Sequence, residues 1–301
     1  MSWTIKTRVD PIKSEQWSKH LLAIIETQRC PSDHAQKMAG RLSSGVNTAH
    51  DRIGRAFVKP FYAQTFEPLP YASGMLVAAA WWWYQFLRLD ISKVWGQMDK
   101  QRLIAWLWTD ASGVARGISA VLLVIIGGAE FWSFTWMVLP DEIWEQLMER
   151  GDHQIAYQEF VAVVLAIGSF NLKKTALHIF VDNNGVLYGF MKGIVKKNEE
   201  VNTGIGKTWL EFASRDIAPQ FYRVESKANL ADGPSRMDFE LMHKLNAQIV
   251  QPVLLQWAYE VWSLPSAQAL DDGWKDVNCL IESETPAACT VALNGVWYGL
   301  S

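Results

Sequence analysis

Four acidic residues stand where predicted elements of secondary structure begin or end. Asp110 follows the apolar run "LIAWLWT" and Asp182 follows "ALHIFV", so each closes a predicted strand. Glu159 lies within a helical apolar pattern over 153–170, and Asp232 stands where a last helix is expected to start. Carboxylates at the ends of neighbouring strands can meet at one sheet edge, where like charges raise one another's pKa. A hard divalent cation resolves that repulsion, because Mg²⁺ prefers oxygen ligands.

Each of these acids also has a plain structural interpretation. An Asp after a strand commonly serves a turn or caps a helix, and a single helical Glu is commonly solvated. Sequence spacing does not show that the four side chains converge. Two alternatives therefore stay open from the residues themselves: four separate structural acids, or one site for two metal ions that hydrolyses phosphodiesters.

The elements around the acids alternate between strand and helix patterns. β-branched and aromatic residues favour strands, and apolar residues at helical spacing favour helices. Such an order predicts an α/β layer fold, with a mixed five-stranded sheet flanked by helices. The predicted strands are 102–110, 117–126, 130–139, 176–182 and 219–226, and the predicted helices are 153–170, 183–195 and 229–245.

Three sections divide the chain. Residues 1–98 read as a mostly helical segment with prolines at its turns, residues 99–240 as the α/β domain, and residues 241–301 as a helix followed by a tail with no assigned role. The apolar stretch 74–87 has 14 residues and is short for a membrane span, so no span is expected.

Composition narrows the class of protein. The 301 residues are 50% hydrophobic and include 16 Trp, which predicts a folded protein with large cores or flat contact surfaces for partners. A net charge of −3 argues against a protein that coats nucleic acid, although Lys and Arg exceed acids locally over 173–236. Three cysteines form neither a disulfide framework nor a zinc spacing, and no secretory signal is seen. These features predict a reducing intracellular compartment, either cytoplasm or nucleus, with an organelle still open.

Four segments, in order, resemble the acidic motifs of the ribonuclease H domain attached to retrotransposon reverse transcriptases. They are "TDASGVARGISAVL", "QEFVAVVLAI", "FVDNNGVLYGFMKG" and "RVESKANLADGPSR", and the last matches the family's N-x-A-D-x-x-S-R signature. Upstream, "KMAGRLSSGVNTAHDRIGRAFVKPFYAQ" and "WWWYQFL" look like the segment that connects polymerase to ribonuclease H. The resemblance covers about residues 35–240.

The resemblance implies an endonuclease that cuts the RNA strand of an RNA–DNA hybrid with two Mg²⁺ or Mn²⁺ ions. Carried over by motif, the metal ligands would be Asp110, Glu159, Asp182 and Asp232, with Glu159 and Asp182 helping to position the attacking water. The 2′-hydroxyl is how such an enzyme tells RNA from DNA. Weaker candidates for substrate contact are Ser112, Asn183, Asn184, Asn229 and Arg236. For Ser112, Asn183 and Asn184, a role as turn or cap residues is at least as well supported.

Two departures from the family keep a second hypothesis in place. The chain has no His between Asp182 and Asp232, where many members have one that helps product release, and it has no polymerase palm. It is expected to be either a polyprotein fragment or a domesticated descendant. The alternative function is a non-catalytic scaffold subunit that contacts other proteins through its Trp-rich surfaces and C-terminal tail. A transposase or resolvase is a third, weaker alternative, against which the Ala-Asp and Ser-Arg signature speaks.

Overall fold

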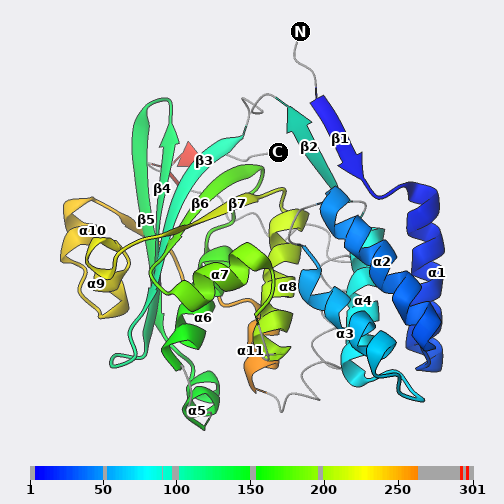
Figure 1. The fold of residues 1–301 in the computed structure, drawn as a ribbon. Helices are drawn as coiled ribbons and strands as arrows, with labels where there is room; N and C mark the ends of the chain where they lie inside the picture. The colour runs from blue at the N-terminus through cyan, green and yellow to red at the C-terminus, as the bar shows by residue number, and fades with distance from the viewer. Residues whose placement is uncertain are drawn as a thin grey trace.

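The computed structural model describes residues 4–49, 53–89, 91–96, 102–149, 154–195, 199–263, 292–293 and 296–297. A helical region and a sheet region lie side by side (Figure 1). The helical region contains β1 (Thr4–Arg8), α1 (Pro11–Thr27), α2 (Ser32–Ala49), α3 (Arg55–Phe66), α4 (Gly74–Arg88) and β2 (Ser92–Gly96). Strands β1 and β2 pair antiparallel, a contact between distant residues that the sequence did not predict.

The sheet region follows the predicted alternation of strands and helices. Its strands are β3 (Leu103–Ala111), β4 (Gly117–Ile126), β5 (Ala129–Val138), β6 (Thr175–Val181), β7 (Ala218–Arg223) and β8 (Gln248–Ile249). Its helices are α5 (Asp141–Glu149), α6 (Gln154–Ser169), α7 (Asn184–Lys192), α8 (Glu199–Ser214), a 3₁₀ turn at Ser226–Ala228, α9 (Asp232–Ser235), α10 (Glu240–Lys244) and α11 (Gln256–Ser263). Two short strands, β9 (Ala292–Leu293) and β10 (Val296–Trp297), pair with each other.

The strand order is β7-β6-β3-β4-β5-β8. Strands β3, β4 and β5 form the predicted antiparallel meander, and β6 joins β3 in parallel. Strand β7 in turn runs parallel to β6, as expected when a helix connects consecutive strands of one sheet. The predicted mixed sheet is therefore confirmed, and it differs from the five-stranded expectation by the two-residue strand β8 beside β5.

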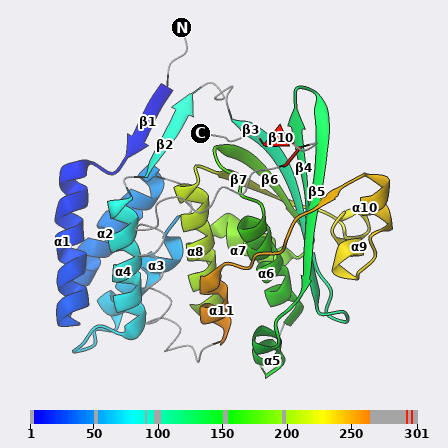
Figure 2. The same cartoon turned by 180° about the vertical axis from the view of Figure 1, so that it is seen from behind.

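The two faces of the sheet are covered differently. Helices α6, α7, α8 and α11 lie on one face, between the sheet and the N-terminal helices, whereas α9 and α10 lie on the opposite face (Figures 1 and 2). Residues of β3 alternate accordingly: Ala105, Leu107 and Thr109 are fully buried on the helix side, and Trp106 and Trp108 are half-buried on the other. This period of two is what a strand with one fully covered face requires.

The helical region shares a hydrophobic core with the sheet region, because α3 packs on α8. Gly206 of α8 faces Phe57 of α3 so closely that a Cβ at Gly206 would lie 2.0 Å from the Phe57 ring. Behind Phe57, the rings of Trp82 and Trp83 are fully buried. The apolar stretch predicted over 74–87 is thus a core helix. Within the described residues no helix has the length and apolarity that crossing a membrane requires.

The region after β7 differs from its prediction. One helix was expected over 229–245, but the structure has the short helices α9 and α10 with a turn between them. Met237 in that turn has φ of 64°, in the left-handed region, which ends a helix. Met242 and Phe239 then pack with Val121 and Phe134 in a separate small core on the outer face of the sheet.

Candidate metal centre

Three of the four predicted acids lie together at the carboxyl end of the parallel pair β3 and β6. One carboxylate oxygen from each of Asp110, Glu159 and Asp182 lies within 4.8 Å of the other two. Trp108 pairs with Phe180 across the two strands, so Asp110 and Asp182, each two residues further on, leave the sheet side by side. Two parallel strands that end at the same edge account for this convergence.

Glu159 reaches the same point from α6 on the covered face of the sheet. Nearly every residue of this helix around it is buried, since Phe160, Val161, Ala162, Val163 and Val164 are at most 2% exposed. A helix that is apolar all round must be covered on both sides. Glu159 is itself only 3% exposed, and its carboxylate accepts a hydrogen bond from the backbone N–H of Ala111. Because α6 is covered on both sides, the carboxylate of Glu159 lies in an apolar layer beneath the strand ends.

Burial and mutual repulsion make the ionised cluster unfavourable without a cation. Burial, followed by the charges of Asp110 and Asp182, raises the pKa of Glu159 to about 10. Burial also raises the pKa of Asp110 to about 7, with further contributions from the charges of Asp182 and Asp232 and an opposing hydrogen bond from Ser235. These directions are the ones expected when carboxylates share a site of low dielectric.

The donor set fits a hard divalent cation. All three side chains offer only oxygen, and Oε2 of Glu159 is buried without a hydrogen-bond partner within the described residues. Native proteins rarely leave a buried carboxylate oxygen unpartnered. A hard divalent cation held by these side chains would supply the missing positive charge, because such cations take oxygen ligands.

Asp232, the fourth predicted ligand, lies beside the cluster but outside it. It is the first residue of α9, and its Oδ1 accepts a hydrogen bond from Nε of Arg236 at 2.9 Å. Its side chain is 36% exposed, and its charge is near enough to raise the pKa of Asp110. The structure thus places three carboxylates together and the fourth at the rim, turned toward Arg236.

The candidate substrate-contact residues occupy varied positions. Ser112 is buried in the β3–β4 turn, where its hydroxyl accepts from the N–H of Ala115. Asn183 caps α7, with Oδ1 accepting from two backbone N–H groups. Asn184 is exposed and accepts a hydrogen bond from Arg223. Arg236 is exposed beside Asp232, so Asn184 and Arg236 face solvent next to the acids.

Asn229 is engaged inside the protein. It is 5% exposed, and its Nδ2 donates to the carbonyl of Thr109 at 2.9 Å and to Oδ1 of Asp110 at 3.1 Å. Its Oδ1 accepts from the N–H of Ala231 at 3.3 Å. Asn229 therefore touches the acidic cluster from within the protein.

Two serines that sequence reasoning missed also contact the acids. Ser235 donates to Oδ2 of Asp110 at 2.6 Å, and Ser226 donates to Oδ2 of Asp182 at 2.7 Å. Ser235 belongs to the Ser-Arg pair of the fourth motif, so the motif itself was a usable signal. For Ser226 the sequence offers no such signal.

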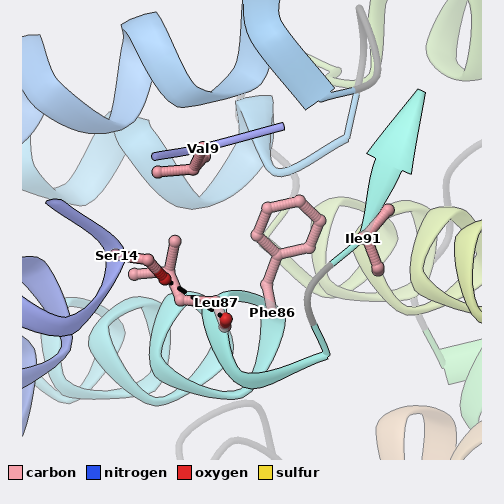
Figure 3. A pocket seen from close by; sticks show the side chains of 5 residues that line it. All are labelled: Val9, Ser14, Phe86, Leu87 and Ile91. Carbon is pink, nitrogen blue, oxygen red and sulfur yellow. Dashed lines mark hydrogen bonds between the residues drawn. The ribbon is translucent and has the colours of Figure 1, made fainter. Parts of the chain in front are cut away.

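A pocket elsewhere offers no comparable chemistry. It lies in the helical region, where it is lined by Val9, Ser14, Phe86, Leu87 and Ile91 (Figure 3). It has room for about one water molecule. The hydroxyl of Ser14 donates to the carbonyl of Leu87 at 3.3 Å, so the polar group there already has a partner.

Comparison with known proteins adds no argument about this chain. No protein family matches the chain, and no curated protein matches it. One similar solved structure is that of RNase H1 from the halophilic archaeon Halobacterium salinarum NRC-1, at 12% identity and a TM-score of 0.29. The match covers 46% of this chain and 98% of that one, a likeness too weak to bear on activity. The strand order and flanking helices themselves confirm the predicted fold class, a ribonuclease H-like α/β fold.

Proposed function

We propose that this chain is a metal-dependent endonuclease that cuts the RNA strand of RNA–DNA hybrids. The observation that carries the proposal is the triad of Asp110, Glu159 and Asp182, the first two of them buried, at the strand ends of a ribonuclease H-like sheet. Bringing three carboxyl groups together, two of them buried, is costly without a cation, because burial and like charge disfavour their ionised forms.

The residues would have three roles: metal binding, orientation of the attacking water and contact with the hybrid. Asp110, Glu159 and Asp182 would hold the metal ions, and Asp232 would join them from the rim. Two Mg²⁺ or Mn²⁺ ions, when bound, lower the pKa of water and stabilise the leaving oxygen of a phosphodiester. Glu159 and Asp182 would orient the water. Exposed polar groups beside the acids, Asn184 and Arg236 among them, would contact the hybrid.

The order of the four motifs supports an origin in a retroelement. On that proposal, residues 1–98 descend from the segment that connects polymerase to ribonuclease H. Their shared core with the sheet region, through Phe57 against Gly206, is consistent with a connection segment that folds onto its nuclease.

A scaffold that binds other subunits is the second candidate, and the outer face of the sheet favours it. Trp108 stacks on Phe180 at 5.1 Å, and Phe180 stacks on Tyr222 at 5.3 Å between ring centroids. Along the same strands, Trp106 stacks on His178 at 5.8 Å. A half-exposed aromatic surface of this kind is typical of protein interfaces.

Cleavage of a labelled RNA–DNA hybrid in Mg²⁺ or Mn²⁺ separates the two candidates. We expect metal-dependent cutting of the RNA strand that Asp110→Asn lowers by on the order of 10²–10³-fold, as for loss of one group that stabilises transition-state charge. The matched control is Glu240→Gln, which removes an exposed acid that pairs with Lys244 and is not part of the cluster. Absence of cutting by folded wild-type protein in both metals would favour the scaffold.

A further inference from the structure

One segment of the chain supplies side-chain donors to both strand-end acids. It runs from Ser226 to Arg236, between β7 and α10, across the ends of β3 and β6. Ser226 donates to Asp182, while Asn229 and Ser235 donate to the two oxygens of Asp110.

The three donors differ in burial. Ser235 is fully buried and Asn229 is 5% exposed, whereas Ser226 is exposed. The Ser235 hydroxyl also lies 2.9 Å from the carbonyl of Asp232, so its short 2.6 Å contact to Asp110 is the stronger of two. Charge-assisted bonds to a carboxylate are stronger than neutral ones.

The sheet fixes this segment through contacts that do not involve the acids. Ser119 of β4 donates to the carbonyl of Ala231 at 2.7 Å, and Asn229 donates to the carbonyl of Thr109. Gly117 lets the backbone come close, because a Cβ there would lie 2.0 Å from the carbonyl oxygen of Ser235. The strands therefore fix the backbone of this segment independently of its hydrogen bonds to Asp110 and Asp182.

We propose that Ser226, Asn229 and Ser235 are positioning residues that orient Asp110 and Asp182 for metal binding. The proposal rests on the proposed function. Each oxygen of Asp110 receives one donor, which fixes the rotation of the carboxylate and leaves the remaining lone pairs for a cation. Partners that hydrogen-bond to ligating carboxylates typically change metal affinity 10–100-fold when removed.

Direct Mn²⁺ binding, measured by titration calorimetry on the full chain, tests this role without relying on activity. We expect Ser235→Ala to weaken Mn²⁺ affinity by about 10-fold, and Ser226→Ala, at an exposed bond, to weaken it by less. The matched control is Ser119→Ala, which removes an equally buried hydroxyl from the docking of the same segment but no donor to an acid. It should lower stability and leave Mn²⁺ affinity unchanged.

The outcomes separate the two proposals. Equal Mn²⁺ affinity in wild type, Ser235→Ala and Ser226→Ala overturns the positioning role alone, as does equal weakening by Ser119→Ala. Absence of Mn²⁺ binding by the folded wild type overturns the nuclease proposal, and the positioning role with it. If Ser235→Ala does not fold, Ser226→Ala decides the question, because its exposed side chain leaves the core untouched.

Discussion

The aromatic core of the N-terminal helices and the acids Asp110 and Glu159 are both buried, yet they differ in charge. Trp83 is fully buried, and its Nε1 donates to the carbonyl of Phe57 at 3.2 Å. Trp82 is buried without a partner for its N–H in the described part of the chain, but an unpartnered neutral group is far less costly than an ionised one. Glu159 buries a carboxylate oxygen beside two other acids. The aromatic core stabilises the fold, whereas the buried acids lower its stability. Acids held at such a cost are typical of functional sites.

The largest stability effect should come from the aromatic core. We expect Trp83→Ala to lower the free energy of unfolding by about 3–5 kcal/mol, because it leaves a large cavity and removes the hydrogen bond from the Trp83 ring to the Phe57 carbonyl. Urea unfolding measures this loss. Trp81→Ala is the matched control, since Trp81 is only half-buried, and a loss as large as that of Trp83→Ala would contradict the account.

The acidic cluster should make the metal-free protein less stable as pH rises. The pKa of Glu159 is raised from 4.5 to about 10 and that of Asp110 from 3.8 to about 7, so between about pH 5 and pH 7 the folded state holds more protons than the unfolded state. Stability then falls with pH, by at most about 1.4 kcal/mol per pH unit for each carboxyl.

Urea unfolding from pH 5 to pH 7 in a metal chelator checks this slope. Glu159→Gln should make the unfolding free energy depend less on pH, because the contribution of Glu159 is lost. Glu240→Gln should leave the pH dependence as in wild type. Stability that rises with pH over this range would contradict the raised pKa values of Glu159 and Asp110.

A smaller effect should follow from the close approach at Gly117. Gly117→Ala places a methyl 2.0 Å from the carbonyl oxygen of Ser235, which must move, and overpacking of this kind costs about 1–3 kcal/mol. We expect lower stability together with weaker Mn²⁺ binding, since Ser235 moves with the segment. Gly40→Ala in α2 is the control, because its Cβ meets no atom within 4 Å, and it should raise stability by about 0.5–1 kcal/mol.

The sequence predicted the elements whose pattern is local. The strands around 102–139 are rich in β-branched and aromatic residues, and α6 carries apolar residues at helical spacing, so each could be predicted from its own residues. Asp110 and Asp182 could be placed at strand ends for the same reason. The convergence of Asp110 and Asp182 could not be predicted from the sequence, because it depends on the parallel register of β3 with β6.

The features that the sequence did not predict depend on distant contacts. The pairing of β1 with β2 joins residues about ninety positions apart, and β8 consists of two residues placed by β5. The break between α9 and α10 reflects packing of Phe239 and Met242 on the outer sheet face, which local helix preference does not contain. The hydrogen bond from the Ser226 hydroxyl to Asp182 likewise joins residues far apart in the sequence.

The most direct test of the central claim is the unfolding free energy at pH 8 of wild type and Asp110→Asn, each with and without Mn²⁺. We predict that Asp110→Asn is more stable than wild type without metal, because a buried like charge is removed, and that it gains much less from Mn²⁺. A variant that is less stable without metal, and that Mn²⁺ stabilises as much as wild type, would show that Asp110 is a structural acid and would contradict the account.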